Sequence, residues 1–184
     1  MELFAAVEAG NAVLHDALVA AVADGWTNPS PCEGWTVRDV AQHIVGGAVR
    51  YRILLEGGGE ELLAPTRTQD QLGDDPVGSN TEKVAAFMAA VHAADLEAPV
   101  QHPSGVRTGR ELLNLRVVEC VAHTWDICVG SGQPVTLDPD LCAFALAAVD
   151  DSGNVEGFYA PPLAASAGTA LDGLLARTGR SQPS

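Results

Sequence analysis

The side chains best suited to chemistry lie between Glu119 and Asp126, together with His43 much earlier in the chain. Glu119 and His123 are four residues apart in a segment with helical periodicity, so both side chains project from one helix face about one turn apart. One glutamate and two histidines from different helices would form the open three-ligand set that is typical of catalytic zinc sites. The sequence therefore predicts a divalent-metal site on His43, Glu119 and His123.

An alternative explains the same residues without a metal. The segment around Glu119 is apolar on nearly every side, and a buried carboxylate is costly unless it is paired or bound to a cation. Arg116, one turn earlier, could form that pair, and His43 and His123 would then be hydrogen-bonded core residues. The spacing of Glu119 and His123 alone favours this alternative, because such spacing is common by chance. The occurrence of two histidines and a glutamate on two long apolar helices favours the metal.

Two carboxylates could orient the predicted ligands. Asp39 lies one turn before His43, and Asp126 lies nearly one turn after His123. A carboxylate that accepts the free ring N–H of a metal-bound histidine fixes the tautomer of that histidine. We expect Asp39 to act mainly as a helix-capping acid, whereas an orienting role and a purely structural role are equally favoured for Asp126.

The cysteines and the familiar catalytic motifs add little. Cys32 precedes the start of a helix, where a thiolate can be favoured, but a structural role is the stronger expectation. The remaining three cysteines are expected to be small core residues, because no C-x-x-C pair or zinc-finger spacing is present. Since the G-x-S-x-G, Walker A and dinucleotide patterns are also missing, we do not expect a serine hydrolase or a nucleotide-binding protein.

Composition limits the class of protein. A chain of 184 residues is most simply one domain, here 1–184, with a core of its own. A net charge of −14 argues against nucleic acid or an anionic membrane as a partner. The N-terminus has no basic segment typical of a signal peptide, and the longest apolar run, 141–149, is too short to span a bilayer. We therefore expect a cytoplasmic protein.

Hydrophobic periodicity and capping residues predict an all-α protein. Thr36 with Asp39, and Thr108 with Glu111, are the clearest helix starts. The predicted helices are 2–24, 37–55, 79–96, 109–129, 139–148 and 169–177. Residues 60–78 are expected to be a loop, and residues 97–107 to be extended or turn. Four long helices with one long crossover are typical of a bundle, in which metal sites lie between facing helices.

Two motifs resemble a known family. Residues 31–40, PCEGWTVRDV, lead to His43, and residues 119–126 read ECVAHTWD. Together they resemble the mycothiol-dependent maleylpyruvate isomerase N-terminal domain family, in the DinB-like superfamily. The segments GFYAPP at 157–162 and TGR at 178–180 resemble a short-chain actinobacterial-type branch of that family. The resemblance extends from about residue 26 to residue 180.

The resemblance implies an all-α, DinB-like four-helix bundle with additional short C-terminal helices. It implies a divalent metal on His43, Glu119 and His123, most commonly zinc, with nickel or iron as alternatives. Relatives in this family include thiol-dependent isomerases and S-transferases that use mycothiol or bacillithiol as a cosubstrate. It also makes a homodimer plausible.

Four functions remain open. A metal-dependent thiol transferase or isomerase of the mycothiol type would bind the thiol at the open metal position and present it to an electrophile. A metal-assisted hydrolase would use a bound hydroxide. A non-enzymatic metal-binding or ligand-binding bundle would keep the site without turnover, and a structural bundle would bind nothing. The thiol enzyme is the leading hypothesis, with a small-molecule thiol or an electrophilic substrate as the partner.

Overall fold

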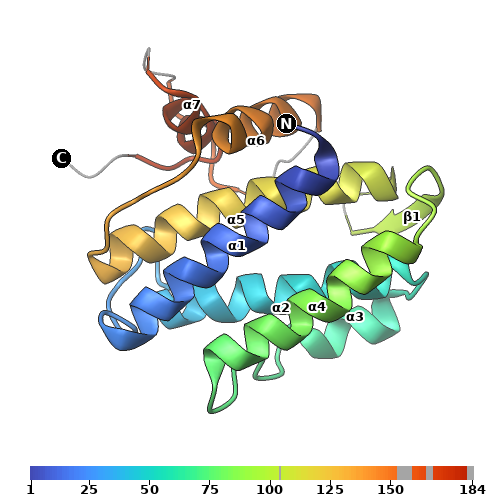
Figure 1. Cartoon of the computed structure of the whole chain (residues 1–184), viewed down its shortest axis with the longest axis horizontal. Coiled ribbons are helices and arrows are strands. Elements are labelled where there is room, and N and C mark those ends of the chain that lie inside the picture. The colour runs from blue at the N-terminus through green and yellow to red at the C-terminus, as the bar shows by residue number, and fades with distance from the viewer. Residues whose placement is uncertain (104, 153–158, 165–167, 182–184) are drawn as a thin grey trace.

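The computed structural model describes residues 1–103, 105–152, 159–164 and 168–181 (Figure 1). These residues are mainly helical, and one two-stranded hairpin accompanies the helices. The elements are α1 (Leu3–Ala23), α2 (Val37–Leu55), α3 (Glu60–Thr66), α4 (Pro76–Ala93), β1 (Pro99–His102), β2 (Gly105–Thr108), α5 (Gly109–Ser131), α6 (Pro139–Asp151) and α7 (Ala170–Arg177). The predicted all-α bundle is therefore confirmed.

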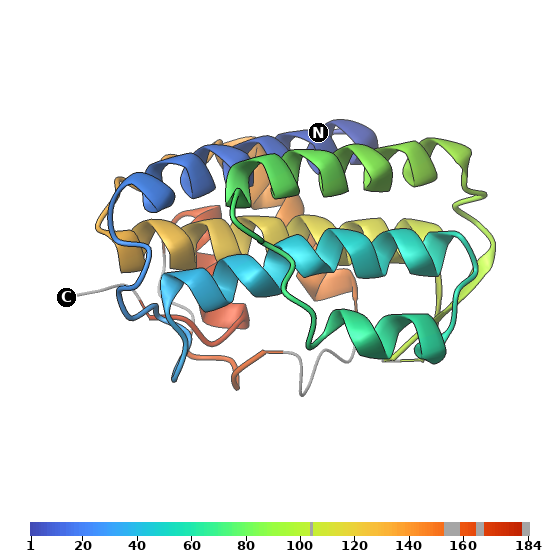
Figure 2. The same ribbon diagram turned by 90° about the horizontal axis from the view of Figure 1, so that it is seen from below.

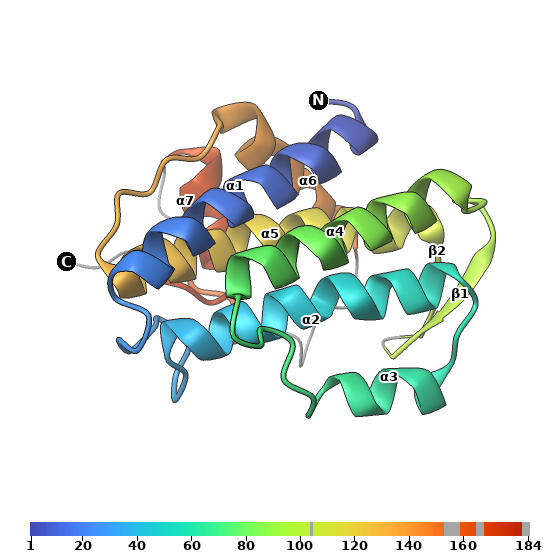
Figure 3. The ribbon, with the colours of Figure 1, turned by 60° about the horizontal axis from the view of Figure 1, so that its bottom comes forward.

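Four long helices form the bundle, and α5 is its central member. Helix α5 packs against α1 and α2, while α4 packs against α2 and α1 and completes the ring. Figure 2 shows α1 and α4 in one layer and α5 and α2 in the next, and Figure 3 shows the four helices side by side. Helices α6 and α7 pack on each other, and α6 covers α5 from outside the ring.

The central position of α5, between α1, α2 and α6, explains why its sequence is so apolar. Because partners surround it, nearly all of its side chains from Leu112 to Cys128 are buried. Burial of each large aliphatic side chain contributes roughly 1.5–3 kcal/mol. Helix α1 is long and apolar enough to meet the length and composition criteria of a membrane span. In this structure α1 buries Leu14 and Leu18 in the bundle core, while Phe4, Val19 and Val22 are exposed.

Local capping fixes the starts of the two helices that carry the predicted ligands. At α2, the Thr36 hydroxyl accepts a hydrogen bond from Asp39 N at 3.2 Å, and Asp39 Oδ2 accepts one from Thr36 N at 2.9 Å. Thr108 and Glu111 form the same reciprocal pair at the start of α5. Each such cap stabilises a helix by about 1 kcal/mol. The caps therefore fix where α2 and α5 begin, and with that the helical positions of His43 and of residues 119–126.

The predictions for two consecutive segments, the loop at 60–78 and the helix at 79–96, were partly wrong. Residues 60–78 are not entirely loop, because α3 forms after Gly59, with acids in its first turn and with Leu63 buried. Helix α4 starts at Pro76 rather than at 79, since Asp75 accepts a hydrogen bond from Gly78 N and Pro76 occupies the first turn. It ends at Ala93 rather than at 96.

The extended segment predicted at 97–107 is a hairpin. Strands β1 and β2 are antiparallel, with Pro99 opposite Thr108 and His102 opposite Gly105. Strand β1 also contacts α2. The hairpin therefore brings His102 and Arg107 to one end of the helix that carries His43.

Candidate metal centre and adjoining pocket

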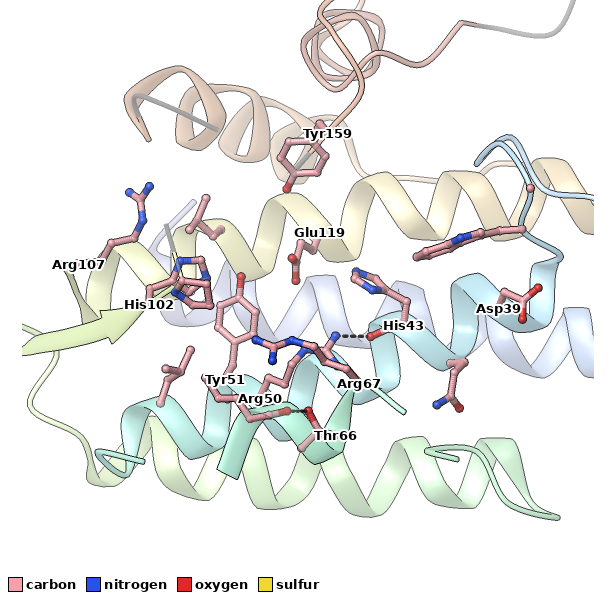
Figure 4. A pocket seen from close by; sticks show the side chains of 17 residues that line it. Asp39, His43, Arg50, Tyr51, Thr66, Arg67, His102, Arg107, Glu119 and Tyr159 are labelled. Atoms are coloured by element: carbon pink, nitrogen blue, oxygen red, sulfur yellow. Dashed lines mark hydrogen bonds between the residues drawn. The ribbon is translucent and has the colours of Figure 1, made fainter. Parts of the chain in front are cut away.

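The structure brings two of the predicted ligands close together and directs the third into the same space. The rings of His43, on α2, and His123, on α5, have centroids 5.1 Å apart and meet edge to face. Glu119 and His43 both line a cavity of about 750 Å³. Figure 4 shows the Glu119 carboxylate and the His43 imidazole pointing into this cavity. The three side chains thus lie near the contact between α2 and α5, and His43 and Glu119, but not His123, are among the residues that line the cavity.

Glu119 has no protein partner in the described part of the structure: neither a hydrogen bond nor an ion pair joins its carboxylate to another described residue. Arg116, the alternative partner, instead donates to the carbonyl oxygen of Ile44 at 3.0 Å and to Asn11 Oδ1 at 3.1 Å. The Arg116–Glu119 ion pair is therefore not formed between these described side chains. The Glu119 carboxylate is available to a cation in the cavity.

The His43 side chain is held in its neutral form. Burial disfavours the charged imidazolium, and His123 and Arg50 add to that effect, so the pKa of His43 is lowered to about 3. Its ring lies 5.3 Å from the Trp35 ring, centroid to centroid. A neutral imidazole is the form that binds a metal, so His43 is ready for ligation across the ordinary pH range.

His123 is oriented by Asp126. Its Nδ1 lies 2.9 Å from Asp126 Oδ2, and the Asp126 side chain is fully buried. Burial alone would raise the pKa of Asp126, but hydrogen bonds from His123 and Arg180 and the charge of Arg180 lower it to about 2. Since an ionised carboxylate can only accept, His123 Nδ1 carries the proton and donates it. The other ring nitrogen, Nε2, is then left with a lone pair for a metal.

Asp39, the other proposed orienting carboxylate, lies on the helix cap. Its Oδ2 accepts hydrogen bonds from Thr36 N at 2.9 Å and Thr36 Oγ1 at 2.6 Å. These two hydrogen bonds lower the pKa of Asp39. Among the described residues, its hydrogen bonds go to Thr36 and not to His43, in line with the expected capping role.

Within the part of the chain that the structure describes, the close group of possible ligand atoms is not the predicted triad of His43, Glu119 and His123; it shares only His123 with that triad. In the described residues, donor atoms of Cys32, His123 and Asp126 all lie within 4.8 Å of one another. Cys32 Sγ donates to Asp126 Oδ2 at 3.3 Å. Burial and the neighbouring Asp126 carboxylate raise the pKa of Cys32 to about 12, so it is a thiol and not a nucleophilic thiolate.

Arg180, which sequence reasoning noticed only within the TGR tail segment, completes this group. Its Nη2 lies 2.7 Å from Asp126 Oδ2, and its Nε lies 2.9 Å from Asp126 Oδ1. The two residues are 54 positions apart, so no local spacing relates them. The only sequence signal was the resemblance of the tail to a family branch.

The cavity also carries basic side chains that the sequence did not indicate. Arg50, Arg67 and Arg107 line it, although the whole chain has a net charge of −14. Arg50 donates to the carbonyl oxygen of His43 at 2.9 Å, and Arg67 forms an ion pair with Glu60. This wall of the cavity is therefore suited to an anionic group.

Two tyrosines add hydroxyl groups to the lining of the cavity. Tyr51 is only 5% exposed, and burial raises its pKa well above the ordinary value. Burial likewise raises the pKa of Tyr159. Neither hydroxyl makes a hydrogen bond to another described residue, and Figure 4 shows Tyr159 on the far side of Glu119 from Tyr51. Both remain protonated and can donate to a molecule in the cavity.

Comparisons with known proteins identify similar sequences and a similar fold. Residues 11–128 match the family model described as the mycothiol maleylpyruvate isomerase N-terminal domain. Two uncharacterized proteins, from two strains of Mycobacterium tuberculosis, are each 31% identical over 135 residues, covering 72% of this chain and 69% of theirs.

A solved structure is similar as well. The crystal structure of a mutant of the mycothiol-dependent maleylpyruvate isomerase matches with a TM-score of 0.58 and 17% sequence identity, over 81% of this chain and 68% of that one. At this identity the likeness concerns the fold alone, and it confirms the predicted DinB-like bundle. The matched family region, 11–128, contains His43, Glu119, His123 and Asp126, whereas Arg180 lies beyond it.

Proposed function

Because the chain belongs to the mycothiol maleylpyruvate isomerase N-terminal domain family, we propose that it is a metal-dependent enzyme that uses a small-molecule thiol of the mycothiol type. His43 and His123 would bind the metal through imidazole nitrogens, and Glu119 through its carboxylate. Zinc is the first choice for this set of ligands. The observation that carries the proposal is the Glu119 carboxylate, which lacks a described protein partner and points into the cavity beside His43.

The residues present fit such a metal. His43 is neutral, His123 has its Nδ1 engaged by Asp126, and Glu119 is free to bind a cation. A bound zinc would supply a position at which a thiol gives up its proton at neutral pH. Trp35 beside His43 and the side chains around Glu119 would limit the access of water to that position.

The cavity is suited to a small molecule. Its volume of about 750 Å³ lies in the usual range of ligand pockets. Arg50 and Arg107 offer positive charge in the lining, and Tyr51 and Tyr159 offer hydroxyl donors. Arg107 also donates through Nη1 to the carbonyl oxygen of Ser152 at 3.3 Å. We therefore propose an electrophilic cosubstrate with an anionic group, held by the arginines while the thiol occupies the metal end.

The first experiment measures metal. The protein is purified without added metal, and bound metal per chain is determined for wild type and alanine variants. We expect His43→Ala, Glu119→Ala and His123→Ala each to lose most of the metal. His15→Ala, at a half-buried position of α1 outside the predicted ligand set, should retain it. Cys32→Ser should also retain it if the cavity side of His123 is the binding side. Full occupancy in both His43→Ala and His123→Ala would refute the shared site.

The second experiment tests turnover. Metal-loaded protein is mixed with a low-molecular-weight thiol and a panel of carboxylate-bearing electrophiles, and loss of the electrophile is followed with and without the thiol. Thiol-dependent consumption that disappears in Glu119→Ala supports the proposal. Metal binding without such consumption would instead support the non-enzymatic metal-binding bundle.

A further inference from the structure

We propose that Arg180 is a positioning residue that acts on the metal site through Asp126 and His123. The inference rests on the metal site proposed above. It assigns a role to the segment after α7, which lies outside the family match at 11–128. In this role Arg180 does not touch the metal or the substrate; it fixes the carboxylate that orients His123.

The Arg180 guanidinium holds both oxygens of Asp126. Its Nε donates to Oδ1 at 2.9 Å and to Oδ2 at 3.1 Å, while Nη2 donates to Oδ2 at 2.7 Å. The Asp126 side chain is fully buried, and the Arg180 side chain is 9% exposed. Charge-assisted contacts to both oxygens are strong and fix the plane of a carboxylate. Asp126 therefore has little freedom to rotate.

The fixed carboxylate determines which nitrogen of His123 can bind a metal. Asp126 Oδ2 is shared, because it accepts from Arg180 and also lies 2.9 Å from His123 Nδ1. A carboxylate in this position holds a histidine ligand in one tautomer and one ring orientation. Without Arg180, Asp126 would be a buried charge with no opposite charge beside it, and the orientation of His123 would no longer be fixed.

Arg180 also occupies the position that a cation would take on the other side of His123. Its Nη2 is 2.7 Å from Asp126 Oδ2, 3.5 Å from His123 Nδ1 and 3.9 Å from Cys32 Sγ. These three residues are the close group of possible metal ligands described above. Since a guanidinium already lies among them, a metal is directed to the Nε2 side of His123, toward His43 and Glu119.

The turn at the end of α7 that positions Arg180 requires a glycine at position 179. Gly179 has a φ of 72°, in the left-handed region that favours glycine, and a Cβ there would lie 2.6 Å from the Ala160 Cβ. Arg180 N donates to the carbonyl oxygen of Leu175 at 2.8 Å, and its Nη1 donates to that of Thr178 at 3.0 Å. The end of α7 therefore aims the guanidinium at Asp126.

The test compares two arginines three residues apart. Arg180→Gln keeps a polar side chain but removes the charge and the contact to both carboxylate oxygens. Arg177→Gln is the matched control, because Arg177 forms an ion pair with Asp150 at the surface. The zinc dissociation constant is measured by competition with a chromogenic chelator. We expect Arg180→Gln to weaken zinc binding roughly 10- to 100-fold and Arg177→Gln to leave it unchanged.

A double-mutant cycle separates positioning from general destabilisation. If Arg180 acts through Asp126, Arg180→Gln should have no further effect on zinc affinity in an Asp126→Asn background. Melting of the metal-free proteins records any structural cost separately. Arg180→Lys, which keeps the charge but not the contact to both oxygens, should give an intermediate zinc affinity, and it replaces Arg180→Gln if that variant does not fold.

The outcomes distinguish this inference from the proposed function. Wild-type protein that binds no zinc would refute the metal site and the role of Arg180 together. Wild-type protein that binds zinc, with an unchanged dissociation constant in folded Arg180→Gln, would overturn the role of Arg180 alone. Fully additive effects of Arg180→Gln and Asp126→Asn would also overturn it, because the two residues would then act independently.

Discussion

Replacing Gly47 on α2 should destabilise the protein, because the buried side chain of Arg116 lies close to this glycine. A Cβ at this position would lie 2.9 Å from Arg116 Nη1 and 3.8 Å from Glu119 Oε2. The second distance is ordinary contact, whereas the first requires Arg116 to move. Arg116 is fully buried and is bonded to the Ile44 carbonyl oxygen and to Asn11, so its guanidinium has nowhere to go without breaking those bonds.

The size of the effect follows from two opposing contributions. Alanine is favoured over glycine inside a helix by about 1 kcal/mol. Loss of one hydrogen bond from a charged group costs about 1.5–3 kcal/mol, and displacement of Arg116 threatens two. We therefore expect Gly47→Ala to lower the free energy of unfolding by about 0.5–2 kcal/mol if one bond is lost and by about 2–5 kcal/mol if both are lost. Metal stoichiometry should be retained, because Glu119 itself is not displaced.

The neighbouring glycine provides the control. A Cβ at Gly46 would lie 2.9 Å from Arg50 Nη1 and 3.1 Å from Gln71 Cγ. Arg50 is only partly buried and lines the cavity, so its side chain can move into the cavity if its bond to the His43 carbonyl oxygen adjusts. The buried Gln71 side chain must move by only a few tenths of an ångström. Urea unfolding of the metal-free variants should show Gly46→Ala within about 1 kcal/mol of wild type, since the gain in helix propensity offsets the adjustment. If Gly47→Ala proves as stable as Gly46→Ala, Arg116 is not fixed in the way described.

Two further predictions concern metal and pH. Removal of zinc by a chelator should lower the melting temperature, since a ligand of the folded state at a thousandfold excess over its Kd contributes roughly 4 kcal/mol; loss of the helical circular dichroism signal on chelation would contradict an independent core. In metal-free protein, the His43 pKa of about 3, against an ordinary value of 6.5, means that the unfolded state binds more protons between these pH values. The free energy of unfolding should therefore fall as pH falls through this range, by about 1.4 kcal/mol per pH unit for each proton taken up. The variant His43→Gln should lose the part of this pH dependence that one proton contributes. An unchanged slope in the variant would refute the neutral His43.

The parts of the fold that are decided by residues close together in the sequence were predictable. Helix α2 starts at Val37 and α5 at Gly109, as predicted, because a threonine and an acid three residues later decide each start between them. Helix α3 was missed for the opposite reason. A helix of seven residues is not stable by its own propensity, and the burial of Leu63 in the hydrophobic core cannot be read from the short segment itself.

The same distinction applies to the site. Glu119 and His123 are close together in the sequence, and their spacing indicated that both side chains lie on one face of a helix. Cys32 and Arg180, by contrast, reach Asp126 across 94 and 54 positions, through a loop and a tail that have no periodic pattern. The arginines of the cavity come from α2, the end of α3 and the hairpin, so their convergence is a property of the packing and not of any one segment.

The balance of charges along α5 explains why Glu119 is the residue to test first. Arg116 donates hydrogen bonds to the Ile44 carbonyl oxygen and to Asn11, while Asp126 forms an ion pair with Arg180. Within the described residues, Glu119 is the one charged side chain of this buried stretch whose carboxylate has neither a hydrogen bond nor an ion pair. Charged groups in a protein interior are normally paired or bound to a cation. A cation between Glu119 and the two histidines would give Glu119 an opposite charge, as Arg180 does for Asp126.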